Sequence, residues 1–153
     1  MHNLVILIAK DFIILPPLLL GYVLIKLPRS EKRRAVLVVI GATILTALLA
    51  LLGSKLFNDP RPFVAGHFTP YFAHSSDNGF PSDHTLLAGL MAALTYLYCK
   101  RLGIFAFAIA ALIGASRVIA GVHHISDIIG ALVFASVGTY LAQLVIGRFL
   151  TKD

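Results

Sequence analysis

The stretch from Asn78 to Cys99 reads NGFPSDHTLLAGLMAALTYLYC and joins a polar turn directly to an apolar run. No charged residue lies between Thr85 and Cys99, whereas Asp83 and His84 stand immediately before the run. The chain has 153 residues, of which 58% are hydrophobic and only 13% are charged. Soluble domains carry about twice that share of charge, so the composition indicates that such runs lie in lipid.

Five apolar segments follow one another along the chain. They cover roughly Leu4–Ile25, Ala35–Gly53, Thr85–Cys99, Leu102–Ala120 and Ile128–Leu150. A helix needs about 20 apolar residues to cross a bilayer, and it satisfies its own backbone hydrogen bonds there. We therefore expect an all-α, multi-pass membrane bundle of about five transmembrane helices that forms one domain over residues 1–153.

Two of these segments need an adjustment to serve as spans. The third is short, so its helix is expected to extend back through His84. The first contains the pair Pro16-Pro17, which removes backbone donors and predicts a kink near Pro16.

Basic residues are concentrated in connections that fall on one side of a five-span bundle. The connection Lys26–Arg34, KLPRSEKRR, carries five of them, and Lys100-Arg101 joins the third and fourth segments. Such loops face the cytoplasm, which predicts an inner (plasma) membrane protein with its N-terminus outside and its C-terminus inside. The net charge of +6 therefore points to a membrane rather than to nucleic acid, and all six histidines fall on the outer side.

The polar stretch Ser116–Asp127 reads SRVIAGVHHISD. His123 and Asp127 are four residues apart, so they share one helix face if the fifth helix starts near His123. A carboxylate there accepts the proton of one imidazole nitrogen and leaves the other nitrogen free as a nucleophile. The alternative is purely structural, because an Asp is also favoured at the positive end of a helix dipole.

Three isolated cations fall on the same predicted face. Arg61 and Arg117 present planar forks that match phosphate oxygens, and Lys55 presents a point charge. Snorkelling towards interfacial water is the alternative for Lys55 and Arg61. Arg117 ends an apolar run, where an ionisable group favours a functional role.

The stretch FPSDH comes directly before the third helix. Ser82 or Asp83 can cap that helix, and the free backbone N–H groups at its start form an anion site. His84 lies in the first turn, where it can donate a proton to a leaving oxygen. Simple capping explains the same residues without any chemistry.

One predicted face of the bundle thus gathers residues from three separate connections. They are three cations, two histidines, one carboxylate and the start of a helix. Phosphoryl transfer needs such a set, namely positive charge around the equatorial oxygens, a nucleophile and a proton donor. The sequence therefore predicts phosphate chemistry at a membrane surface.

Three motifs carry a family resemblance. The pattern S-R-x5-H-x3-D is complete over Ser116–Asp127. The pattern P-S-G-H is matched by Pro81–His84 with Asp83 in place of Gly, and K-x6-R-P is matched over Lys55–Pro62 with one residue fewer. With these motifs the chain resembles the type 2 phosphatidic acid phosphatase (PAP2) superfamily, whose catalytic core is shared with vanadium haloperoxidases.

The segments RPFVAGHFTP and DNGFPSDHT are more narrowly similar to bacterial undecaprenyl-diphosphate phosphatases of the bacitracin-resistance type. This resemblance implies a polyprenyl (undecaprenyl) diphosphate substrate in the bilayer. It also implies hydrolysis to the monophosphate and phosphate at the extracytoplasmic face, a step of cell wall (peptidoglycan) biosynthesis.

The resemblance implies a role for each candidate residue as well. His123 is the nucleophile that forms a phosphohistidine, Asp127 orients it, and His84 protonates the leaving oxygen. The phosphate is held by the remaining site residues, Lys55, Arg61, Ser82 and Arg117. No metal or other cofactor is expected, because the cations take the place of Mg²⁺. The oligomeric state is left open.

Three alternatives remain open from the sequence. One is another lipid phosphate as substrate, such as phosphatidate or phosphatidylglycerophosphate. Another is a metal-dependent enzyme in which Zn²⁺ is bound by His84, His123, His124 and Asp127. The third is a non-catalytic transporter or channel, although the charges gather at helix ends rather than at mid-bilayer. The other loop histidines, His67 and His74, are expected to be solvated.

Overall fold

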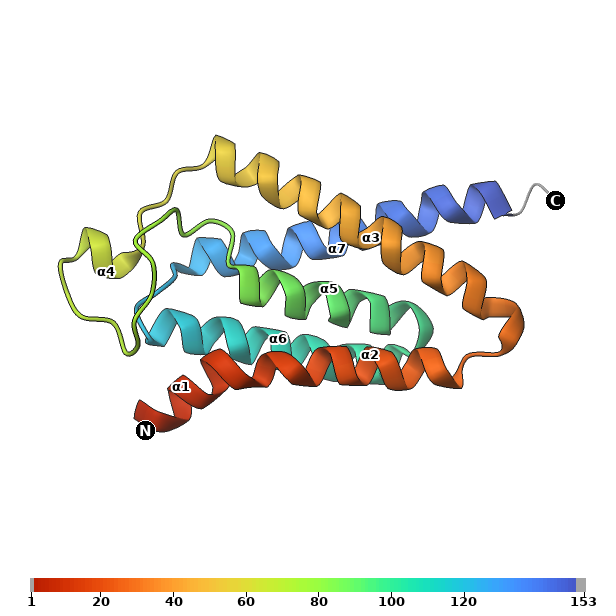
Figure 1. The fold of residues 1–153 in the computed structure, drawn as a ribbon, viewed down its shortest axis with the longest axis horizontal. Coiled ribbons are helices and arrows are strands. Elements are labelled where there is room, and N and C mark those ends of the chain that lie inside the picture. The colour runs from red at the N-terminus through yellow and green to blue at the C-terminus, as the bar shows by residue number, and fades with distance from the viewer. Residues whose placement is uncertain (1, 151–153) are drawn as a thin grey trace.

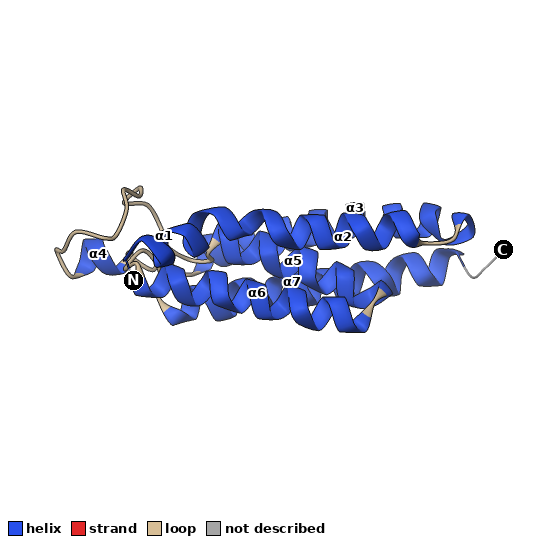
Figure 2. Ribbon diagram, turned by 90° about the horizontal axis from the view of Figure 1, so that it is seen from below, coloured by secondary structure: helices blue, strands red, loops and turns tan. Residues whose placement is uncertain are grey.

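The computed structural model describes residues 2–150, and its regular elements there are all helical. The helices are α1 (His2–Asp11), α2 (Leu15–Lys26), α3 (Arg29–Leu56), α4 (Pro62–Ala65), α5 (Asp83–Tyr98), α6 (Lys100–Ile119) and α7 (Ile125–Leu150). The long helices lie side by side along one axis, and the short α4 stands in the long connection at one end (Figures 1 and 2). This arrangement confirms the predicted all-α bundle.

Four helical stretches are long and apolar enough to cross a membrane. They are His2–Lys26, Arg29–Leu56, Lys100–Ile119 and Ile125–Phe149, with mean hydropathies between 1.9 and 2.8. Apolar side chains cover their outer surface, where Ile25 is 73% exposed and Ile104 is 62% exposed. Because a surface of this kind is stable only in an apolar solvent, the bundle has the exterior of a multi-pass membrane protein.

The remaining long helix, α5, has 16 residues and is shorter than a usual span. It is the central helix of the bundle, because it packs against α2, α3, α6 and α7. Its buried positions include the small residues Ala88, Gly89, Ala92 and Ala93, which let neighbouring backbones approach closely. As predicted, α5 extends back through His84.

The predicted kink in the first segment is confirmed. α1 ends at Asp11, a 3₁₀ turn covers Phe12–Ile14, and α2 begins at Leu15. Pro16 and Pro17 therefore stand in the first turn of α2. A proline is tolerated there, because the N–H group that it lacks would have no partner within the helix.

The two ends of the bundle differ in their connections (Figure 1). The start of α1, the connection 57–82 and the connection 120–124 meet at one end, which we call the loop end. The α2–α3 and α5–α6 connections lie at the opposite end, which we call the basic end because Lys26–Arg34 and Lys100-Arg101 surround it. The chain thus begins at one end of the bundle, and α7 finishes at the other. Which end faces the cytoplasm stays a prediction.

Candidate active site

The connection between α6 and α7 carries the predicted nucleophile. The sequence analysis expected His123 to lie at the start of the last helix. In the structure His123 lies in the turn two residues before α7. The predicted contact nevertheless forms, with His123 Nδ1 3.1 Å from Asp127 Oδ2. The backbone N–H of His124 donates a second hydrogen bond of 2.8 Å to the same oxygen. The turn, rather than a helix face, therefore brings His123 to Asp127.

The partners of the His123 ring define its tautomer. Asp127 can only accept at Nδ1, whereas Arg61 and Arg117 can only donate at Nε2. Arg61 Nη1 lies 3.2 Å and Arg117 Nη2 lies 3.4 Å from that Nε2. The proton of a neutral His123 therefore sits on Nδ1, and the lone pair of Nε2 faces two guanidinium groups.

The electrostatics of the turn keep His123 neutral. Its side chain is only 2% exposed, and this burial lowers the pKa of His123 below its usual value. The positive charges of Arg117 and Arg61 lower the pKa further, while the hydrogen bond to Asp127 acts in the opposite direction. A neutral imidazole is the form that can attack phosphorus.

Arg61 is held by the connection that precedes α5. Asp77 Oδ1 lies 2.8 Å from Arg61 Nη2 and accepts from Arg61 Nε at 3.0 Å. The carbonyl of Val122 accepts from Arg61 Nη1 at 3.1 Å, and that of Asn78 from Nη2 at 3.4 Å. These contacts fix the guanidinium fork while leaving Nη1 beside His123.

Arg117 is 2% exposed and makes no ion pair with a carboxylate among residues 2–150. Its Nη1 donates to the carbonyl of Ala9 at 3.2 Å, and its Nη2 lies 2.8 Å from His74 Nε2. The Nε of Arg117 is buried and has no hydrogen-bond partner in the described part of the chain. A buried cation with a spare donor is well suited to bind an anion.

Ser82 and His84 stand at the start of α5. Ser82 occupies the N-cap position, but its hydroxyl makes no capping bond; it accepts from the Thr85 hydroxyl at 3.2 Å instead. This corrects the expectation of a side-chain cap. His84 is half-buried, makes no hydrogen bond to residues 2–150, and interacts electrostatically with Arg117 and His123. Its ring nitrogens are thus free for a ligand.

Lys55 is the one predicted phosphate ligand that the structure leaves apart. It lies exposed in the last turn of α3 and makes no hydrogen bond or ion pair within the range 2–150. α3 ends at Leu56, so Arg61 lies in the connection beyond the helix and no helical periodicity aligns its side chain with that of Lys55. The assignment of Lys55 to the phosphate stays a prediction.

Three residues of the loop end were not identified from the sequence. Half-buried His74 contacts Arg117, and its ring meets that of His123 edge-on at 5.9 Å between centroids. Burial lowers the pKa of His74, and the charges of Arg61 and Arg117 lower it further. His74 is therefore part of the site rather than a solvated loop residue. The other two are Asp77, described above, and Asn78.

Asn78 ties the connection 57–82 to the end of α3. Its amide nitrogen donates to the carbonyls of Ser54 and Phe57, at 2.9 and 2.8 Å, and its Oδ1 accepts from the N–H of Asp59 at 3.0 Å. The next residue, Gly79, passes so close to the site that a Cβ there would lie 3.1 Å from Asp127 Oδ2. The pair Asn78-Gly79 was the one sequence signal for this turn.

The zinc ligands suggested by the sequence do not form one group. Among the residues described, the ligand atoms that gather within 4.8 Å of one another belong to Asp59, His124 and Asp127. His84 and His123 are not members of this group, because His123 directs Nδ1 to Asp127 and Nε2 to the arginines.

Comparison with known proteins agrees with this geometry. The sequence model of the PAP2 superfamily matches residues 34–149. The chain is 33% identical over 147 residues to the putative undecaprenyl-diphosphatase YbjG of Escherichia coli, covering 95% of this chain and 73% of that protein. It is 31% identical over 138 residues to a lipid A 1-phosphatase of Rhizobium etli, covering 84% of this chain and 60% of that protein.

Among solved structures, the crystal structure of Aquifex aeolicus LpxE matches with a TM-score of 0.67. The match covers 92% of this chain and 82% of that chain at 24% identity, a level that supports the fold alone. The chain belongs to the PAP2 superfamily. It is a membrane lipid phosphatase, a hydrolase.

Proposed function

We propose that this enzyme hydrolyses a polyprenyl diphosphate, undecaprenyl diphosphate, to the monophosphate and phosphate through a phosphohistidine on His123. The observation that carries the proposal is the environment of His123. Its Nδ1 is directed at Asp127, and its Nε2 faces the guanidinium groups of Arg61 and Arg117. A nucleophile oriented by a carboxylate next to paired anion-binding groups is the arrangement that phosphoryl transfer requires.

In the first step, the Nε2 lone pair of His123 attacks the terminal phosphorus. A P–N bond forms, and the bond from that phosphorus to the bridging oxygen breaks. Burial lowers the pKa of His84 to about 4, and the negative charge of the bound diphosphate raises it again, so that His84 is protonated in the complex. His84 then gives its proton to the bridging oxygen, which leaves as part of the lipid monophosphate. General acid catalysis of this kind contributes about 10²–10⁴-fold. The resulting positive charge on the His123 ring is balanced by Asp127.

In the second step, water attacks the phosphohistidine. Neutral His84 takes a proton from the water, a new P–O bond forms, and the P–N bond breaks. Free phosphate leaves, and both histidines return to their starting forms. Throughout, Arg61 and Arg117 compensate the charge on the transferred phosphoryl oxygens, with the Ser82 hydroxyl and the N–H groups at the start of α5 as further donors. Lys55 would join them only when substrate is bound.

The surroundings of His123 suit a lipid headgroup. A cavity of about 740 Å³ is lined by His123 together with Ile119 and Ile125. These isoleucines are 58% and 66% exposed on the outer surface of the bundle, so the cavity adjoins the side that faces lipid. We propose that the diphosphate enters from the headgroup layer while its tail stays in the bilayer.

We also propose that the loop end is extracytoplasmic in an inner (plasma) membrane and that residues 1–153 form one catalytic domain. The exposed basic residues at the opposite end support this sidedness, because such residues favour the cytoplasm. Residues 1 and 151–153 of the proposed domain lie outside the described part of the structure.

Another lipid phosphate is the second candidate substrate. The Rhizobium etli relative is named a lipid A 1-phosphatase, and the arginines and histidines recognise phosphate rather than a tail. Phosphatidate and phosphatidylglycerophosphate therefore belong in the same comparison. They differ from a polyprenyl diphosphate in the leaving group, which is an alcohol rather than a phosphate.

The test is phosphate release by purified protein in excess EDTA, with His123→Ala alongside. Undecaprenyl diphosphate, phosphatidate, phosphatidylglycerophosphate and lipid A are offered separately and in competition. The proposal expects the highest kcat/KM for the diphosphate and no release by His123→Ala. A clear preference for one of the other lipids would replace the proposed substrate, and full activity of His123→Ala would refute the mechanism.

A further inference from the structure

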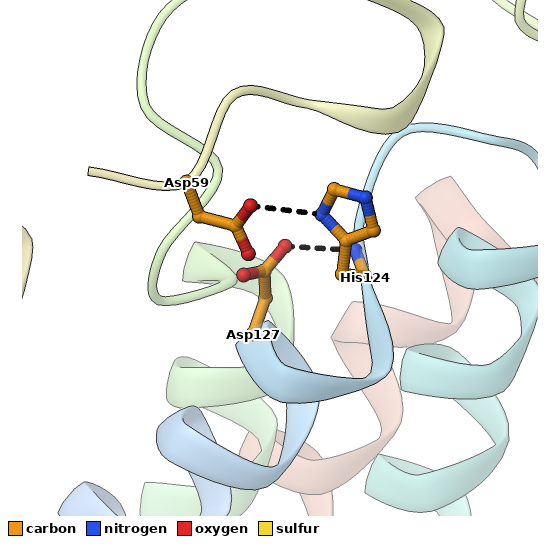
Figure 3. Close-up of side chains that lie close together, drawn as sticks. All are labelled: Asp59, His124 and Asp127. Carbon is orange, nitrogen blue, oxygen red and sulfur yellow. Dashed lines mark hydrogen bonds and ion pairs between the residues drawn. The ribbon is translucent and has the colours of Figure 1, made fainter. Parts of the chain in front are cut away.

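A second group of polar side chains shares Asp127 with the candidate active site. Asp59 comes from the connection after α3, His124 from the connection before α7, and Asp127 from the first turn of α7 (Figure 3). Their ligand atoms all lie within 4.8 Å of one another. His124 Nδ1 is 3.1 Å from Asp59 Oδ1.

One oxygen of this group is not used by the chain. Asp127 Oδ2 accepts from His123 and from the backbone of His124, whereas Asp127 Oδ1 is buried and has no hydrogen-bond partner among residues 2–150. The Asp127 side chain is 0% exposed. Figure 3 shows its carboxylate directed towards that of Asp59. Two facing carboxylates repel each other unless a shared proton or a cation lies between them.

We propose that Asp59, His124 and Asp127 form a binding site for a divalent transition-metal ion, with Zn²⁺ as the best match. One imidazole nitrogen with two carboxylate oxygens is a ligand set that Zn²⁺ accepts, whereas Mg²⁺ and Ca²⁺ favour oxygen alone. The direct contact between His124 and Asp59 would give way to contacts with the ion.

The site is accessible and adjustable. The side chains of His124 and Asp59 are 40% and 30% exposed, so both can rotate to reach the bond lengths of zinc, about 2.0–2.2 Å. Both residues also line the cavity beside His123, which gives an ion a path from solvent. The nearest arginines act on the opposite side of the His123 ring, and Arg61 is paired with Asp77.

Zinc at this site is expected to inhibit the enzyme. Asp127 would bind the ion through Oδ1 while its Oδ2 still orients His123, so the ion would withdraw negative charge from the carboxylate. The imidazolium character that develops on His123 during attack would then be less well balanced. Binding does not depend on the substrate, whereas inhibition rests on the proposed roles of His123 and Asp127.

Binding is measured first, with chelator-treated, full-length protein in detergent and Zn²⁺ in competition with a chromophoric chelator. We expect one site, and a loss of affinity of at least about tenfold in His124→Gln and in Asp59→Asn, because removal of even an outer-shell partner costs ~10–100-fold. His67→Gln is the matched control, since His67 is an exposed histidine of the same end. Unchanged zinc affinity in both variants would overturn the proposal.

Phosphate release from undecaprenyl diphosphate is then titrated with Zn²⁺. Each rate is expressed relative to the same protein's zinc-free rate, because Asp59 and His124 line the cavity beside His123. His124→Gln and Asp59→Asn should resist zinc on this scale, while His67→Gln should be inhibited like the wild type. Equal inhibition of all four proteins would place the inhibitory ion elsewhere and refute the site. Absence of basal turnover would instead refute the proposed substrate, and the binding measurement would still decide whether the zinc site exists.

Discussion

The two ends of the bundle carry the same kind of charge in opposite environments. At the basic end the cations are exposed, namely Lys26, Arg29, Lys32, Arg33, Arg34, Lys100 and Arg101. At the loop end Arg61 is 4% exposed and Arg117 is 2% exposed. Exposed cations need no partner, whereas a buried cation is costly unless an anion compensates it. Burial, rather than charge, therefore separates the cations that we propose for catalysis from those that we propose to set the membrane topology.

The largest expected effect comes from the residue that both buried arginines face. His123→Ala should lower kcat by on the order of 10⁴-fold or more, because no other group replaces the nucleophile. Acid-labile radioactive phosphate, trapped on the wild type with labelled substrate, should be absent from this variant. His67→Ala serves as the control for folding and yield. Trapped phosphate on His123→Ala would show that another residue is the nucleophile.

His84 is the next most sensitive position of the loop end. His84→Ala should reduce turnover of the diphosphate by about 10²–10⁴-fold, the usual contribution of a general acid. A substrate with a much better leaving group needs less protonation of the leaving oxygen. The fold-loss of turnover in His84→Ala should therefore be smaller with that substrate than with the diphosphate. Equal losses with both substrates would argue that His84 only supports the fold.

The contrast between the ends is tested directly by matched substitutions. Arg117→Lys keeps the charge but removes the planar fork, and it should cost about 10²–10³-fold in kcat/KM. Arg33→Lys at the basic end should leave kcat/KM unchanged, because Arg33 is exposed. Similar effects at the two ends would refute the view that burial distinguishes functional from topological cations.

The acidic limb of the pH–rate profile depends on the burial of His123 beside the two arginines. In the proposed mechanism His123 reacts as the neutral base. Burial and the charges of two arginines lower its pKa, so the acidic limb of kcat/KM should lie below pH 6.5. Removing one positive charge stabilises imidazolium and raises its pKa. The acidic limb of the Arg117→Gln profile, measured on its residual activity, should therefore have its midpoint at a higher pH than that of the wild type. A shift to lower pH would contradict this electrostatic account.

The smallest loss of activity is expected for Lys55, which tests the comparison between the two ends of the bundle. Its sequence position belongs to the loop end, but its exposure is that of the basic end. An exposed point charge is screened by water and salt, so Lys55→Ala should reduce kcat/KM by about tenfold or less. The loss should appear in KM and grow at low ionic strength. A loss as large as that of Arg117→Lys would contradict this prediction, because it would mean that Lys55 holds the phosphate as firmly as a buried arginine does.

The regular elements follow closely from the sequence. Long apolar runs predict helices because a bilayer leaves the backbone no other partner, and Pro16-Pro17 predicts the break that separates α1 from α2. The contact of His123 with Asp127 was also accessible, since four residues separate the two. The prediction attributed that contact to a helix, whereas a turn makes it.

The parts that sequence analysis missed lie in the connection 57–82. His74, Asp77 and Asn78 have no periodicity that distinguishes them from solvated loop residues. They are positioned by hydrogen bonds to Arg117, Arg61 and the end of α3, all distant along the chain. The pairing of His124 with Asp59 was missed for the same reason.

The sequence by itself determined the membrane bundle, the family motifs and which residue types are available for phosphate chemistry. These properties are encoded in local composition and short spacing, which the chain carries before it folds. The tertiary structure decided that Arg61 meets His123, 62 positions away along the chain. It also decided that Arg117 is buried while Lys55 is exposed. Finally, it left Asp127 Oδ1 without a hydrogen-bond partner among residues 2–150. Burial and long-range contacts depend on how the helices pack and where three connections meet, which local composition does not specify.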